Sequence, residues 1–205
     1  MKKRALRKDF YMEIRKSLGR FLSIFFIVSL GVSFFSGIRA SEPDMRISGD
    51  AYFDEKNLMD IKVISTMGLT KDDLHAIEGI SDVAKAEGGF SQDMLLNIDD
   101  NQKVLHVMSI PKSMNELTVS EGRMPEKEGE CLVDIDFLEG TSYRIGDTIT
   151  LTGEDSGILE VKEFKIVGTG SSPSYISFGR GSSLIGTGTV SGFLTVTDEN
   201  FSPDT

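Results

Sequence analysis

The feature that most constrains this chain is an uncharged apolar segment close to its N-terminus. Residues 21–38 read FLSIFFIVSLGVSFFSGI and contain no charged side chain. As an α-helix this segment would span about 27 Å, close to the roughly 30 Å hydrocarbon core of a bilayer. Arg20 and Arg39 flank it, and their long side chains can reach the headgroup layers. The segment therefore predicts a transmembrane helix.

Charge is divided unequally across this segment. Residues 1–20 hold eight basic and two acidic side chains, whereas residues 41–205 hold 13 basic and 30 acidic ones. Because basic flanks stay on the cytoplasmic side of a membrane, we expect residues 1–20 in the cytoplasm and residues 41–205 to be extracytoplasmic, at a bacterial plasma membrane. An acidic body also argues against a nucleic-acid partner.

Two other interpretations of residues 21–38 stay open. The core helix of a soluble protein can be apolar, although few such helices lack charge for five turns. A cleaved signal peptide has a similar layout, but the basic region before the segment is long. Residues 36–40 (SGIRA) also lack an A-x-A cleavage motif. We favour a retained membrane anchor.

The basic head carries a single apolar stripe, which recurs every four residues at Leu6, Phe10, Ile14 and Leu18. Such a helix is suited to lying on the anionic inner leaflet of a membrane. It would equally serve as a cytoplasmic extension of the transmembrane helix. The stripe alone does not decide between these two interpretations.

A second stripe, of small residues, lies within the apolar segment. Ser29, Ser33 and Gly37 are spaced by four and would fall along one side of a helix. Small residues allow helix backbones to approach closely in a bilayer, so the stripe predicts a helix-packing surface. Serine and glycine are also common in membrane helices for no such reason, and this alternative stays open.

The remaining residues, 41–205, are expected to form one mixed α/β domain, so the fold class is α+β with an N-terminal transmembrane helix. Thr70 and Asp73 have capping-box spacing, which predicts a helix over 71–78. Asp99–Gln102 is expected to be a polar turn, and the Gly- and Ser-rich stretch 168–192 an exposed loop. Alternation and β-branched residues predict strands at 60–66, 83–90, 92–98, 103–110, 130–134, 147–152, 159–169 and 192–197.

No motif in the sequence supplies a catalytic centre. There is no G-x-x-x-x-G-K-[ST] phosphate loop and no G-x-S-x-G nucleophile elbow. Cys131 is expected to be a small buried residue, and His75 and His106 to be ordinary surface or hydrogen-bonded histidines. The acidic pair Asp134 and Asp136 lacks the spacing of a calcium loop. We expect no enzyme activity, no cofactor and no metal, and a membrane-anchored hydrolase is the least favoured interpretation.

Four segments resemble the start of the FtsX-like permease family of ABC transporters, which is related to MacB. They are DIKVISTMGLTKDDLHAIEGISDV (60–83), EGRMPEKEGECLVD (121–134), YRIGDTITL (143–151) and FKIVGTGSSPSYIS (164–177). The resemblance implies a MacB-like periplasmic core domain over residues 41–205, following a cytoplasmic helix (1–20) and a transmembrane helix (21–38). It implies no catalytic residue in this chain.

The same resemblance implies a set of partners. They are a separate cytoplasmic ABC ATPase, membrane lipid, and further permease helices or a second permease copy. Family members continue through more membrane helices, so we expect this sequence to be the N-terminal portion of a longer permease. The alternative is a stand-alone, single-pass anchored domain that binds or senses something outside the cell.

Overall fold

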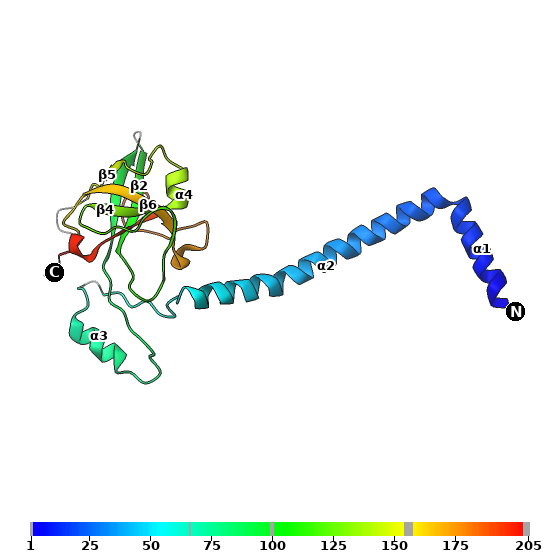
Figure 1. The fold of residues 1–205 in the computed structure, drawn as a ribbon, viewed down its shortest axis with the longest axis horizontal. Helices are drawn as coiled ribbons and strands as arrows, with labels where there is room; N and C mark the ends of the chain where they lie inside the picture. Colours follow the sequence, from blue (N-terminus) through cyan, green and yellow to red (C-terminus); the bar gives the residue numbers. More distant parts are fainter. Residues whose placement is uncertain (1, 66, 99–100, 154–157, 203–205) are drawn as a thin grey trace. The chain divides into compact units, whose positions relative to one another are not determined.

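The computed structural model describes the whole chain except residues 1, 66, 99–100, 154–157 and 203–205. The chain divides into two compact units, residues 1–52 and residues 53–205 (Figure 1). The first is helical and the second contains a sheet, as the sequence predicts for the fold class. The division into a cytoplasmic, a transmembrane and an extracytoplasmic part concerns membrane topology and stays a prediction.

The first unit contains two helices, α1 (Lys2–Lys16) and α2 (Leu18–Glu55), whose last residues lie beyond the unit boundary. The predicted transmembrane segment, residues 21–38, lies within α2. This helix does not end at Arg39 but continues past Pro43 to Glu55. The charged residues after Ile38 mark the end of the apolar segment, and nothing in that change of polarity stops a helix.

The second unit is built on one seven-stranded mixed sheet with the order β1-β2-β7-β4-β6-β3, with β5 paired to β6. Its helices are α3 (Lys71–Glu78), α4 (Ile135–Glu139) and the 3₁₀ turns 173–175 and 198–200. The strands are β1 (Ser91–Ile98), β2 (Asn101–Ser109), β3 (Thr118–Gly122), β4 (Glu130–Asp134), β5 (Thr148–Thr150), β6 (Glu163–Ser171) and β7 (Val190–Val196).

Strand β4 occupies the centre of the core. It pairs in parallel with β6 and antiparallel with β7, and all five of its residues are buried. A strand enclosed by neighbours on both edges and covered on both faces reads as a continuous apolar run, which ECLVD nearly does. Helix α4 follows it at once and adds Phe137 and Leu138 to the core.

One glycine allows α4 to pack closely on the sheet. A Cβ atom on Gly192 of β7 would lie 2.6 Å from the Cβ of Phe137, closer than two carbon atoms can approach. Any larger side chain at position 192 would therefore push α4 away from the sheet. This contact fixes the segment that begins at Asp134, which matters for the site described below.

Helix α3 confirms the prediction at both ends. The side chain of Thr70 accepts a hydrogen bond from the backbone N–H of Asp73, and Asp73 accepts one from the backbone N–H of Thr70. These contacts lower the pKa of Asp73, first through the backbone N–H of Thr70 and then through its hydroxyl. Gly79 ends the helix. Both ends depend on contacts within one turn, which is why the sequence alone predicts them.

Most predicted strands are confirmed, with shifted ends, but two are wrong. Residues 60–65 and 83–90 form no strand, although the first of them alternates in hydrophobicity. In the first segment, Ile61 and Ile64 are largely exposed. In the second, the Glu87 carboxylate accepts hydrogen bonds from the backbone N–H groups of Lys112 and Ser113. A strand needs a hydrogen-bonded neighbour as well as alternation, and residues 60–65 have none among the described residues. In 83–90, the Phe90 carbonyl accepts a hydrogen bond from the Ser109 backbone N–H, next to the point where β1 begins.

The predicted loop at 168–192 is only partly correct. Strand β6 extends to Ser171 and β7 begins at Val190, so the connection is residues 172–189, with a 3₁₀ turn at Pro173–Tyr175. Glycines 168 and 170 lie in β6, where the backbone approaches β3. For the predicted turn at Asp99–Gln102, residues 99–100 lie outside the described part of the chain, and 101–102 belong to β2.

Candidate functional site: an apolar helix, its junction with α1, and a braced loop

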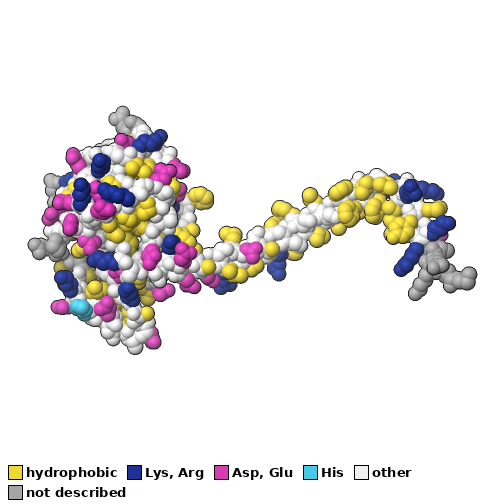
Figure 2. All heavy atoms as spheres, in the orientation of Figure 1, with side chains coloured by type: hydrophobic (Ala, Val, Ile, Leu, Met, Phe, Trp, Pro, Cys, Tyr) yellow, Lys and Arg dark blue, Asp and Glu magenta, His cyan; other side chains and the backbone are white. Residues whose placement is uncertain are grey.

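Helix α2 is long and apolar enough to cross a membrane. None of its residues is buried, and large side chains such as Leu30 (76% exposed) and Phe34 (72% exposed) point outward. Figure 2 shows apolar side chains along this helix and basic ones at its α1 end. A core helix would bury one face, so that interpretation of residues 21–38 does not fit. A signal sequence near the N-terminus remains compatible with the same features.

The small-residue stripe lies on α2 as its spacing requires. Ser29 is half-buried, whereas Ser33 and Gly37 are exposed, and apart from the backbone of its own helix nothing lies within 4 Å of the position that a Cβ of Gly37 would take. The Gly37 carbonyl accepts a hydrogen bond from the Ser41 hydroxyl. A packing role for the stripe stays a prediction.

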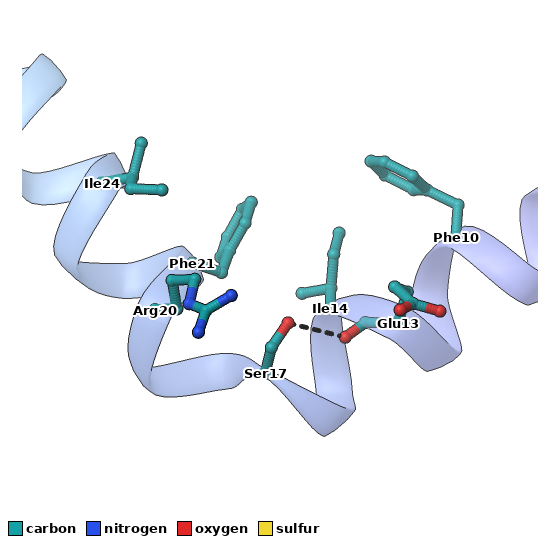
Figure 3. A pocket seen from close by; sticks show the side chains of 7 residues that line it. All are labelled: Phe10, Glu13, Ile14, Ser17, Arg20, Phe21 and Ile24. Carbon is teal, nitrogen blue, oxygen red and sulfur yellow. Dashed lines mark hydrogen bonds between the residues drawn. The ribbon is translucent and has the colours of Figure 1, made fainter.

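Helices α1 and α2 meet at Ser17, where the helical assignment is interrupted. The head is therefore not one unbroken helix with α2. The hydroxyl of Ser17 donates a 3.0 Å hydrogen bond to the backbone carbonyl of Glu13. The inside of the junction is a groove lined by Phe10, Glu13, Ile14, Ser17, Arg20, Phe21 and Ile24 (Figure 3). Two residues of the predicted stripe, Phe10 and Ile14, thus face the start of the apolar segment.

In the sheet unit, the most constrained cluster is centred on Arg180, in the 172–189 connection. Its Nε and Nη2 atoms donate to the two carboxylate oxygens of Asp134, at 2.6 and 3.1 Å, and Nη2 also reaches Asp136. Asp134 is fully buried and the Arg180 side chain is 8% exposed. The ion pair raises the pKa of Arg180, with the Asp134 hydrogen bonds as the main cause. A buried carboxylate of this kind needs its partner, because an unpaired charge in the interior is very costly.

Arg180 also holds the backbone of its own connection. Its Nη1 donates to the carbonyl oxygens of Tyr175 and Ser177, at 3.0 and 2.6 Å. The ring of Tyr175 stacks on Phe193 of β7, with ring centroids 5.2 Å apart. Burial, and then the charges of Asp93 and Asp134, raise the pKa of Tyr175 to about 12. The connection is therefore tied to the sheet, although its Gly and Ser content suggests freedom.

A second cluster ties the same connection to β1 and β2. Asp93 accepts a hydrogen bond from the Ser183 hydroxyl on one oxygen, and its other oxygen bonds Nδ1 of His106, both at 2.6 Å. These are the residue types of a hydrolytic triad in the wrong order, because the serine contacts the carboxylate and not the imidazole. A nucleophilic serine needs the histidine as its base. This arrangement therefore ties the connection to the sheet and is not that of a catalytic triad.

On either side of Arg180 and Ser183 the connection presents apolar side chains to solvent. Phe178 and Leu184 are fully exposed, and Ile176 is more than half exposed. We name residues 172–189 the braced loop. An exposed apolar group that is already held in place loses little conformational freedom when it contacts another apolar surface.

The other residues considered for chemistry are placed without forming a centre. Cys131 is fully buried, as predicted, and burial raises the pKa of its thiol. His75 lies on exposed α3 beside Glu78, and His106 is hydrogen-bonded to Asp93, again as predicted. Within the described residues, no three His, Cys, Asp or Glu side chains cluster as metal ligands would.

Sequence reasoning missed Arg180 altogether. The available signal was a lone arginine within a run of Gly and Ser, together with the acidic residues Asp134 and Asp136 at the end of an apolar strand. That pairing joins residues 46 positions apart, so no local pattern predicts it. The acidic pair was considered only for calcium, whereas its actual ligand is a guanidinium group.

Comparisons with known proteins add a distant likeness to a transporter domain. No family model matches the chain, and no curated protein matches it. Among solved structures, it is similar to the extracellular domain of a noncanonic ABC-type transporter, YknZ, from Gram-positive bacteria. The two share 11% identity with a TM-score of 0.40, over 65% of this chain and 64% of the other. We draw no functional conclusion from a likeness at this level.

Proposed function

We propose that this chain is the N-terminal portion of an FtsX/MacB-like permease subunit of an ABC transporter. Residues 1–20 would lie in the cytoplasm, residues 21–38 would span the plasma membrane, and the sheet unit would be extracytoplasmic. The observation that carries the proposal is α2, whose 18-residue uncharged segment buries no side chain and follows a strongly basic head. The sequence resemblance of the four quoted segments is what supports this choice of family.

In this role the chain would perform no chemistry of its own. A separate cytoplasmic ATPase would hydrolyse ATP, and the movement would pass along α2, for export or for mechanical signalling across the membrane. Because α2 is helical from Leu18 to Glu55, no loop interrupts it between the membrane segment and residue 55. Further permease helices, or a second permease copy, would pack on the stripe at Ser29, Ser33 and Gly37.

The first test concerns topology. In the full chain, single cysteines would be introduced as Ser41→Cys or Ser17→Cys and exposed in intact cells to a membrane-impermeant thiol reagent. Cys131 can stay, since it is fully buried and its thiol is protonated. We expect labelling of Ser41→Cys and none of Ser17→Cys. The reverse pattern would overturn the orientation, and loss of an N-terminal tag placed before residue 1 would indicate a cleaved signal peptide.

The second test separates a permease from a stand-alone anchored domain, since both share the same topology. The full chain would be purified from its own membranes in mild detergent. A permease subunit should bring with it a P-loop ATPase whose hydrolysis rate changes when more of the chain is added. Recovery of the chain without any ATPase would favour the anchored binding or sensor domain.

A further inference from the structure

We propose that the groove at the α1–α2 junction is a binding site for one anionic phospholipid of the inner leaflet. Its headgroup would lie at Arg20, and the first part of an acyl chain would lie along Phe10, Ile14, Phe21 and Ile24. The inference rests on the proposed membrane topology and goes beyond it, because it assigns a site, a lipid charge and a residue that selects it.

The groove combines apolar walls with a charged end, as a phospholipid combines acyl chains with a charged headgroup. Its volume is about 220 Å³, and four of its seven lining residues are apolar. Phe10 comes from α1, whereas Phe21 and Ile24 come from α2, so the apolar walls face each other across the bend (Figure 3). All three are exposed, Phe10 to 63%. Apolar walls open to water gain by contact with a hydrocarbon chain.

Arg20 supplies the charged end of the groove. Its side chain is exposed and lines the groove, and within the described residues its guanidinium makes no ion pair or hydrogen bond. Ser17, beside it, has its hydroxyl engaged with the Glu13 carbonyl. A free guanidinium next to apolar walls is suited to the planar, two-point binding of a phosphate group.

The depth of the groove fits this ligand. Arg20 immediately precedes the uncharged segment 21–38, so in a membrane it would lie at headgroup level, while Ile24 would lie one turn deeper. The surrounding head carries eight basic and two acidic residues, which favours an anionic over a zwitterionic lipid. Glu13, on the opposite wall, opposes the anion and should weaken its binding.

The chain contains no tryptophan, so one introduced tryptophan reports a single position. The full chain carrying Phe10→Trp would be reconstituted in phosphatidylcholine vesicles containing a minority of brominated lipid. That quencher would be either brominated phosphatidylglycerol or brominated phosphatidylcholine, at equal fraction. We expect the local association of brominated phosphatidylglycerol to be about fivefold stronger, the factor typical of one basic side chain near an anionic surface.

Matched charge changes show whether this lipid preference comes from a specific site or from the general attraction of a basic head to anionic lipid. Arg20→Gln should reduce the preference at position 10 to below about twofold, whereas Arg15→Gln removes the same charge outside the groove and should leave most of it. Glu13→Gln should increase it. Equal losses in Arg20→Gln and Arg15→Gln, or equal quenching by the two lipids in the parent, would overturn the site.

A second reporter separates this inference from the proposed function. Val32→Trp lies in the membrane segment, away from the groove, and should be quenched equally by both brominated lipids. If that probe is quenched but position 10 shows no preference, α2 is in the bilayer and only the lipid site fails. If that probe is quenched by neither lipid, α2 is not in the bilayer, and the topology and the lipid site both fail.

Discussion

Phe34 of α2 and Phe164 of β6 are the same residue in opposite surroundings. The first is 72% exposed and the second is completely buried. The same contrast holds between Leu30 of α2, which is 76% exposed, and Leu194 of β7, which is completely buried. In the sheet unit, apolar side chains from six strands and α4 pack together in one core, whereas none of the apolar side chains of α2 is buried.

The backbone explains why both arrangements are stable. A helix satisfies its N–H and C=O groups within itself, so α2 can expose every side chain to lipid without an unpaired polar group. A strand depends on neighbours that are distant in sequence, so the sheet unit exists only once those neighbours meet. The difference predicts that the two units respond in opposite ways to the same substitution.

The largest expected effect comes from truncating one phenylalanine in each unit. Phe164→Ala should lower the free energy of unfolding of the sheet by about 4 kcal/mol, since it removes a fully buried ring and leaves a cavity. Phe34→Ala should leave that free energy unchanged. Urea-induced unfolding of the full chain in detergent, followed by circular dichroism, measures both. Equal losses would mean that α2 contributes to the core of the sheet unit.

Breaking the buried ion pair of the braced loop should lower the free energy of unfolding of the sheet nearly as much as Phe164→Ala does. Arg180→Leu leaves the Asp134 carboxylate buried without its partner, at an expected cost of about 3 kcal/mol in the same measurement. Arg144→Leu removes an exposed arginine whose guanidinium donates hydrogen bonds to the nearby carbonyl groups of Thr141 and Tyr143, and should cost less than about 0.5 kcal/mol. A small effect of Arg180→Leu would show that the loop is not held through Asp134.

A pH-dependent effect is expected at the first residue of β4. Arg123 donates hydrogen bonds to both carboxylate oxygens of Glu130, and this contact, followed by the backbone N–H of Glu126, lowers the pKa of Glu130 to about 2. The ordinary pKa is 4.5, so the stabilisation is present above pH 4.5 and is lost as the pH falls towards 2. The urea midpoint of the parent should approach that of Glu130→Gln over this window. A constant difference between the two proteins would contradict the assigned pKa.

The smallest effect on sheet stability, but a clear one on assembly, is expected from the small-residue stripe. Ser33→Leu places bulk on the stripe and should impair assembly or transport in the complete permease, whereas Phe25→Leu, off the stripe, should be mild. Neither should move the urea midpoint of the sheet, because both lie in α2. Co-purification of permease subunits in detergent measures assembly. Equal tolerance of both changes would mean that the stripe has no packing role.

Local patterns determined a good part of this protein. The apolar segment, the basic head, the capped helix at 71–78 and the buried strand at 130–134 each depend on residues within a few positions of one another. The hydrogen bonds of a helix cap join residues within one turn, and a long run of uncharged apolar residues is enough to predict a transmembrane helix. None of these predictions required knowing where distant residues lie.

Tertiary structure decided what depends on distant partners. Residues 60–65 have the alternation of a strand but no strand partner in the described chain, and they are irregular. The connection at 172–189 has the composition of a free loop but is held by Arg180 to Asp134 and by Ser183 to Asp93. The pattern of side chains shows which face of a segment is apolar. Strand pairing, and the contacts that hold a loop in place, form only when segments far apart in sequence meet.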